Sequence, residues 1–177
     1  MVLLVQYTLI FASVLALVAL GGCFSEHSGV INIGLEGIMV MGALGGALAM
    51  KFLPASTPGI VLFILIVLAS VLVGMAFSLL LGFAAIHFNA DQTLVGTALN
   101  LMGTAAAVVI VRAINVAENP DNVSSTVVYR QAKQVFLVKI GDFEFNWFML
   151  IIVLAIIASH IVLYRTKFGL RLCACGE

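Results

Sequence analysis

The sequence has little charge. Only 9% of its 177 residues are Asp, Glu, Lys or Arg, whereas a soluble globular domain is usually about one quarter charged. Too few polar side chains are present to cover a water-facing surface, which excludes an ordinary soluble domain. The eight acidic and eight basic residues cancel, and so nothing indicates a nucleic-acid partner. We therefore expect a membrane protein whose outer surface contacts lipid.

Cysteine is also scarce. The three cysteines are Cys23, Cys173 and Cys175, an odd number without a pairing pattern. The closely spaced pair could bind a metal or be redox active, but no second cluster of ligands accompanies it. We interpret all three as small apolar residues near a membrane interface, and we expect no metal site.

Long hydrophobic runs dominate what is present. The chain is 63% hydrophobic, with a mean hydropathy of +1.24. A bilayer core about 30 Å thick needs ~20 apolar helical residues to cross it. Five stretches fit, and they predict an all-α, polytopic membrane helix bundle of about five transmembrane helices, with residues 1–177 forming a single membrane domain. The five stretches are residues 2–20, 31–50, 59–86, 94–111 and 147–163.

Two of these stretches need comment. The first lacks the positively charged start of a signal peptide, because the first Lys or Arg is Lys51, and we expect it to be a retained helix. The third has no charge and is longer than one span requires. It predicts a tilted helix, a kink near Gly74 or Gly82, or a partly re-entrant turn.

Residues 112–146 form the one long polar segment. Asn119-Pro120 within it is a turn signal, and the alternating residues around Gly141-Asp142 predict a short hairpin at the membrane surface. After the fifth span, a cluster of Lys and Arg indicates a cytoplasmic side by the positive-inside rule. Five spans then place both the N-terminus and the 112–146 loop outside.

Small residues recur at four-residue spacing on two of the predicted helices. In a membrane, such spacing lets helix backbones approach closely. We expect these positions to form helix-packing faces: Gly42 and Gly46 on the second span, and Gly74, Ser78 and Gly82 on the third.

The stretch GGCFSEHSGVINIGLEG is polar although it separates two apolar runs. Residues 25–29 predict a polar turn. Asn32 and Glu36 lie four apart, which predicts that both lie on one face of the helix that begins there. A charge inside a span costs ~2.5–3.5 kcal/mol near the bilayer centre, and is tolerated at an end or beside a water-filled path. Gly34 and Gly37 would let another backbone come close. Glu36 is either a residue that caps or bonds backbone at the membrane edge, or part of the lining or gate of a solute pathway.

A second polar group lies in NADQTLVGTALN. Gln92, Gly96 and Asn100 share one face at spacing four. Together with Asn32 and Glu36 they supply neutral donors and acceptors and one carboxylate, which suits a neutral solute bearing hydroxyl and amide groups. The sequence shows no nucleophile–base pair, metal-ligand set or phosphate-binding loop, and so we expect no enzymatic activity and no cofactor held by this chain.

Two alternatives to a pathway for a neutral solute remain open from the residues alone. Glu36 and Asp91 could form the proton relay of an ion-coupled secondary transporter. The chain could also be a membrane scaffold that transports nothing.

Three stretches together resemble a known family. ALGGCFSEHSGVINIGLEGIMVMGA, ADQTLVGTALNL and TKFGLRLCACGE look like landmarks of the membrane permeases of bacterial ABC importers. They are most similar to the nucleoside branch of the family that also serves simple sugars and branched-chain amino acids. The three stand in the expected order, and the hydrophobic segments between them fit.

The resemblance implies a permease of the bacterial plasma membrane for nucleosides or a related sugar-like solute. It implies a homo- or heterodimer of permease subunits that passes the solute along a shared interface by alternating access. It also implies two cytoplasmic ATPase subunits, which bind the ATP, and an extracytoplasmic binding protein that delivers the solute.

Residues 164–177 resemble the lead-in to the cytoplasmic coupling helix, which docks into the ATPase. We expect Phe168 to seat in the interface, Arg171 to bind lipid headgroups or ATPase carboxylates, and Gly169 to permit a bend. The resemblance places the start of the coupling helix at Gly176 and Glu177. Family members continue through that helix and further spans, and so we expect this chain to be the N-terminal portion of a permease, a truncated gene or a fragment.

Overall fold

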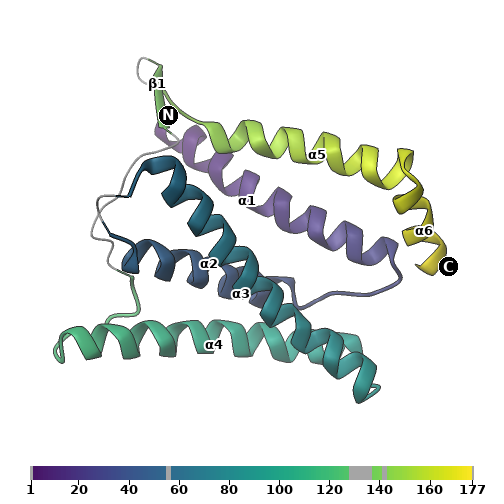
Figure 1. The fold of residues 1–177 in the computed structure, drawn as a ribbon, viewed down its shortest axis with the longest axis horizontal. Helices are drawn as coiled ribbons and strands as arrows, with labels where there is room; N and C mark the ends of the chain where they lie inside the picture. The colour runs from purple at the N-terminus through teal and green to yellow at the C-terminus, as the bar shows by residue number, and fades with distance from the viewer. Residues whose placement is uncertain (1, 55–56, 128–136, 141–142, 177) are drawn as a thin grey trace. The chain divides into compact units, whose positions relative to one another are not determined.

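The computed structural model describes residues 2–54, 57–127, 137–140 and 143–176. They are mainly helical, which confirms the predicted all-α class, with one small strand pair in addition (Figure 1). The chain divides into two compact units. One joins Met1–Asn32 to Phe136–Glu177, and the other is Ile33–Val135. That residues 1–177 form a single membrane domain stays a prediction.

The second unit is a bundle of three helices: α2 (Leu35–Phe52), α3 (Gly59–His87) and α4 (Gln92–Glu118). Helix α2 packs against both of the others. Helix α3 matches its predicted span and runs as one uninterrupted α-helix, which contradicts the re-entrant turn. The buried core of the unit joins α3 to α4 and is covered by residues of α2 and α4; it contains Phe77, Leu81 and Leu99, packed by Ile38, Met41 and Val95.

Small residues bring α2 and α3 together, as predicted at three of the five positions. A Cβ added to Gly42 would lie 3.3 Å from the Ser70 carbonyl oxygen, and one added to Gly46 would collide with the Ser70 hydroxyl. Gly74 faces Gly42, with 3.7 Å between the added Cβ and the Gly42 Cα. These contacts pair α2 and α3 as antiparallel helices.

The other two predicted packing positions behave differently. The Ser78 hydroxyl donates to the Met75 carbonyl of its own helix at 2.8 Å. A Cβ added to Gly82 meets no atom of the described residues within 4 Å. The packing face of α3 therefore ends before Gly82 in the described part of the chain.

Helix α4 extends seven residues beyond the predicted span end at residue 111, to Glu118. The expected start of the polar loop at Arg112 is therefore wrong. Residues 112–118 contain neither Gly nor Pro, and the helix stops where Asn119 precedes Pro120, because proline disfavours helical backbone in the residue before it.

The first unit holds α1 (Val2–His27), α5 (Trp147–Arg165) and α6 (Lys167–Gly176). The strands β1 (Leu137–Ile140) and β2 (Phe143–Asn146) precede α5 and pair antiparallel, which confirms the predicted hairpin; its turn at residues 141–142 lies outside the described residues. Figure 1 shows α1 and α5 side by side, with α6 turned away from the end of α5.

Helices α1 and α5 run in the same direction. The start of α1 lies near β2, just before α5 begins, and its last turn meets the last turn of α5, where Tyr164 Oη lies 3.3 Å from His27 Nε2. Two parallel spans must be separated by an odd number of crossings. The three helices α2 to α4 supply that number, in agreement with the five-span prediction.

Helix α1 is longer than its predicted span. Residues 25–27 were expected in a polar turn, yet the helix runs to His27 and the turn itself begins at Ser28. Polar side chains do not end a helix when they can bond to it: the His27 Nδ1 lies 2.8 Å from the Cys23 carbonyl oxygen, one turn back.

Four helices among the described residues, α1 to α4, are long and apolar enough to cross a membrane. Counting α5 and α6 together across their 71° bend gives a fifth. Many large apolar side chains on these helices are exposed, for example Phe11 at 67% and Ile60 at 74%. An apolar exterior is stable only against lipid, and the chain is a multi-pass membrane protein.

The topology predicts which positions an impermeant thiol reagent reaches. We expect a reagent added outside intact cells to label Val123→Cys, in the polar segment after α4, and to leave Ala174→Cys on α6 unlabelled. Both positions are exposed, and the three native cysteines are first replaced by serine. Labelling of position 174 without position 123 would show that the topology is inverted.

Candidate functional site

The start of α2 is capped by a side chain of another helix. Gly34 stands at the N-cap and has no side chain to bond the first turn. Asn100 of α4 takes its place: its Oδ1 accepts a hydrogen bond from the Gly37 N–H at 2.7 Å. Its Nδ2 donates to the Ile33 carbonyl oxygen at 2.8 Å. One amide thus satisfies two backbone groups at a helix end, where intrahelical partners are missing.

Glycines let the two helices approach closely enough for this cap. A Cβ on Gly37 would lie 2.5 Å from the Leu99 carbonyl oxygen, and one on Gly103 would lie 2.9 Å from the Gly37 Cα. A Cβ on Gly96 would lie 2.9 Å from the Gly34 nitrogen. The close approach expected at Gly34 and Gly37 is therefore present, and Gly96 is buried in this contact.

Asn32 and Glu36 do not share a helical face. Helix α2 begins at Leu35, and Asn32 precedes it outside any helix, so the predicted placement on one face is wrong. The glycine-containing turn at residues 33–34 delays the helix start. Glu36 is exposed in the first turn, where a carboxylate interacts favourably with the helix dipole. The Asn32 Oδ1 is buried and has no hydrogen-bond partner among the described residues.

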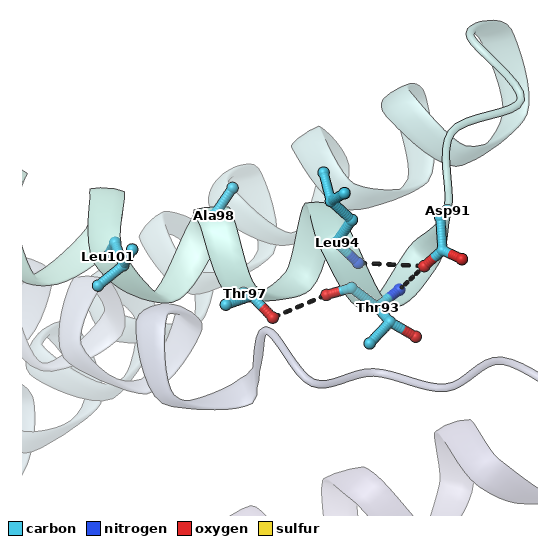
Figure 2. A pocket seen from close by; sticks show the side chains of 6 residues that line it. All are labelled: Asp91, Thr93, Leu94, Thr97, Ala98 and Leu101. Carbon is cyan, nitrogen blue, oxygen red and sulfur yellow. Dashed lines mark hydrogen bonds between the residues drawn. The ribbon is translucent and has the colours of Figure 1, made fainter.

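The face of α4 that carries Gly96 and Asn100 is packed, and a different face is open. An open groove of about 670 Å³ runs along this helix, and Figure 2 shows the side chains that line it. The Thr97 hydroxyl donates to the Thr93 carbonyl at 2.9 Å and keeps its acceptor lone pairs. The groove is lined by Asp91, Thr93, Leu94, Thr97, Ala98 and Leu101.

Asp91 has a structural task in this groove. Its Oδ1 accepts hydrogen bonds from the Thr93 and Leu94 N–H groups at 2.8 and 3.1 Å, which makes it the N-cap of α4 (Figure 2). Gln92, the first residue of the helix, is partly buried. The predicted pathway residues are thus divided between a packed face and a helix start, and their part in a solute pathway stays a prediction.

A polar cluster that was not predicted from the sequence lies at the opposite ends of α2 and α4. Lys51 Nζ lies 3.0 Å from Glu118 Oε2 and 3.4 Å from Asn115 Oδ1, and the Lys51 side chain is only 8% exposed. Asn115 is 2% exposed, and its Nδ2 donates at 2.9 Å to the carbonyls of Ser124 and Thr126. The one available signal for this cluster was Asn115 itself, a polar residue in the continuation of the apolar pattern of the fourth span.

Helix α6 presents a mixed surface. Phe168 and Leu170 are 61% and 67% exposed, and Arg171 is exposed beside them. Gly169 is buried, and a Cβ there would collide with the Leu163 carbonyl oxygen. The helix breaks at Thr166, and the missing Cβ of Gly169 lets α6 pack closely against the end of α5 at this bend; the part of Gly169 in permitting the bend stays a prediction. Glu177 lies outside the described residues.

The comparisons with known proteins bear on this arrangement of helices. Residues 4–177 match the family model described as the branched-chain amino acid transport system / permease component. The chain belongs to this permease family. The match confirms the resemblance that the three sequence landmarks carried.

Curated relatives of the permease cover nearly the whole chain. The guanosine ABC transporter permease protein NupQ of Bacillus subtilis (strain 168) is 36% identical over 183 residues, which span 99% of this chain and 56% of that protein. The nucleoside ABC transporter permease protein NupC of Lactococcus lactis subsp. cremoris (strain MG1363) is 33% identical over 180 residues, with 99% and 56% coverage.

A third relative aligns over a shorter stretch. The putative glucose ABC transporter permease protein TsgC13 of Haloferax volcanii is 36% identical over 101 residues, which span 57% of this chain and 29% of that protein. The permease chain thus spans about half the length of the first two relatives. No solved structure shows significant similarity to it.

The cap on α2 predicts a specific loss of stability. Asn100→Ala removes both bonds to the start of α2, and we expect the free energy of unfolding to fall by about 1–3 kcal/mol. Asn100→Asp keeps an acceptor for the Gly37 N–H, and we expect a smaller loss. Thermal unfolding in detergent measures the difference. Thr104→Ala is the matched control, because the Thr104 hydroxyl bonds within its own helix. Equal melting temperatures for Asn100→Ala and the control would contradict the cap.

Proposed function

We propose that this chain forms part of the transmembrane permease of an ABC importer for nucleosides or a related sugar-like solute. The observation that carries the proposal is the alignment of 99% of the chain with the permeases named for guanosine and nucleoside transport. The first unit has parallel spans, and the second has antiparallel ones. These spans and their apolar exterior agree with a permease. The proposed activity is alternating access, with a pathway that opens to one side of the membrane at a time.

The proposed partners follow from the importer class. A second permease subunit, identical or different, completes the pathway; two cytoplasmic ATPase subunits bind and hydrolyse ATP; and an extracytoplasmic protein delivers the solute. We place the ATPase contact at α6, because Phe168 and Leu170 expose apolar surface next to Arg171 at the end predicted to be cytoplasmic. Hydrolysis belongs to the partner, and this chain is not proposed as an enzyme.

The proposed solute route borders the start of α2 and the open face of α4. Glu36 is exposed in the first turn of α2, while Asn100 and Gly96 hold that turn in place. The hydroxyls of Thr93 and Thr97 add neutral hydrogen-bonding groups along the groove. Neutral acceptors and donors suit the hydroxyl groups of a sugar or nucleoside better than they suit an ion.

The ion-coupled alternative receives less support from the geometry. It required Asp91 as one member of a proton relay with Glu36. Asp91 instead accepts two backbone N–H bonds and caps the start of α4. This capping role accounts for Asp91 without a proton relay.

The function is tested with the complete transporter in proteoliposomes, supplied with its ATPase and binding protein. We expect uptake of labelled guanosine to require ATP on the side of the membrane where the ATPase is bound. A protonophore should not reduce this uptake, and excess unlabelled nucleoside should reduce it. Leucine is the control solute, because the family model is named for branched-chain amino acids. Uptake that persists without ATP and is abolished by the protonophore would favour the ion-coupled alternative.

Glu36 is the sharpest test of the proposed route. We expect Glu36→Gln to lower uptake by about 10-fold or more while the protein inserts and assembles normally, since a lost charge-assisted hydrogen bond is worth about 1.5–3 kcal/mol. Glu26→Gln is the matched control: Glu26 is also exposed, but it lies on the last turn of α1. Uptake and membrane abundance are measured together. Normal uptake by Glu36→Gln would leave Glu36 only its favourable interaction with the helix dipole.

A further inference from the structure

Helix α6 touches the turn after α1 through two glycines. Gly29 has a positive φ of 77°, and a Cβ added there would lie 2.9 Å from the Gly176 Cα. A Cβ added to Gly176 would lie 2.7 Å from the His27 carbonyl oxygen and 2.8 Å from the Gly29 nitrogen. All three distances are shorter than real Cβ contacts allow. The last residue of α6 therefore meets the turn backbone to backbone, with glycine required on each side.

The turn that receives α6 is bonded to the end of α1. The Ser28 and Gly29 N–H groups donate to the carbonyls of Ser25 and Glu26, each at 3.0 Å. The Ser25 hydroxyl donates across the turn to the Val30 carbonyl at 2.9 Å, and the Val30 N–H donates back to the Ser25 carbonyl at 3.2 Å. These bonds make the turn a continuation of α1, so that a displacement of the turn moves the helix end with it.

The other end of α6 is fixed to α5. The Thr166 hydroxyl donates to the Val162 carbonyl and accepts from the Gly169 N–H at 3.4 Å, which caps α6 directly after the break. The contact between Gly169 and the Leu163 carbonyl closes the elbow between the two helices. Helix α6 is thus held at its first turn by α5 and at its last residue by the turn after α1.

A third link joins α1 and α5 directly. His27 Nδ1 lies 2.8 Å from the Cys23 carbonyl oxygen and must donate to it. In the neutral ring, Nε2 is then the acceptor for the Tyr164 hydroxyl, 3.3 Å away. Each of the three helices therefore contacts the other two: α1 with α5, α5 with α6, and α6 with the turn after α1.

We infer that Gly176 and Gly29 form a joint that passes displacement of α6 directly into α1. The inference rests on the proposed function, because the force would come from the ATPase that docks on α6. Without the joint, motion of α6 would reach the membrane helices through α5 alone. With it, α1 and α5 move as a pair. A contact between two backbones contains no side chain that could rotate and absorb a movement. Small shifts of one backbone are therefore passed directly to the other. Gly29 and Gly176 are positioning residues in this role.

The test uses the complete transporter in proteoliposomes, with ATP hydrolysis and solute uptake measured on the same preparation. We expect Gly176→Ala to keep ATPase assembly and basal hydrolysis, and to lower solute-stimulated hydrolysis and uptake per ATP by roughly 2- to 30-fold, the range for residues that carry coupling without touching a ligand. Gly82→Ala is the matched control, because an added methyl group there meets no described atom within 4 Å.

The outcomes separate the inference from the function on which it rests. If Gly176→Ala shows the same solute-stimulated hydrolysis and the same uptake per ATP as wild type and Gly82→Ala, the joint is overturned. The proposed importer function is then unaffected. A wild-type protein that neither assembles with the ATPase nor takes up solute overturns the proposed function.

A cross-link decides the matter if Gly176→Ala does not accumulate in membranes. Ser28→Cys is paired with the exposed native Cys175, next to Gly176, after Cys23 and Cys173 are replaced by serine. A short bismaleimide should join the two positions with and without ATP, and joined protein should keep solute-stimulated hydrolysis because the joint stays closed throughout the cycle. Failure to cross-link, or loss of stimulation on cross-linking, would overturn the inference.

Discussion

The structure of the second unit depends on satisfying the backbone at the start of α2. A helix that begins inside or beside a bilayer has N–H groups that water cannot readily reach, and each unsatisfied group costs several kcal/mol. Gly34 and Gly37 leave the first turn without a capping side chain of its own. Asn100 supplies that cap from α4, and the close approach it needs is possible because the facing residues are glycines. The cap and the glycine contacts therefore require one another.

Helices α2 and α4 are joined at both ends by polar groups. At one end Asn100 bonds the first turn of α2, and at the other Lys51 reaches Glu118 and Asn115. Between these ends the contact is made by small residues and core side chains. Apolar packing alone specifies little in lipid, because the tails are as apolar as the core, whereas paired polar groups fix which helix faces which. The two polar ends thus set the register of α2 on α4.

The sequence predicts the helices well because membrane spans follow from hydropathy alone. The span at 59–86 was predictable in this way, whereas the hairpin before α5 was predictable from alternation and turn residues, and the G-x-x-x-G contact of α2 from the spacing of small residues. Helix ends were less predictable. Charge and polarity mark where a span leaves the lipid, but α1 and α4 continue as helices beyond that point, to His27 and Glu118.

The candidate site was predictable only in part. Spacing correctly put Gly96 and Asn100 on one face. It could not show that this face packs against the start of α2, because the contacting residues Gly37 and Asn100 are 63 residues apart in the sequence. Spacing also assumed that Asn32 is helical, although the helix begins later. Long-range partners such as Lys51 and Asn115 leave no periodic signal, since each is a single polar residue at the end of a helix.

The buried amide of Asn115 has a consequence for how the polar segment after α4 can evolve. Its principal bonds go to main-chain carbonyls, those of Ser124 and Thr126, which any residue would provide. The path of residues 119–126 is therefore specified from within the helix, and their outward side chains do not have to specify it. These residues can therefore change their outward side chains and still keep the same backbone path.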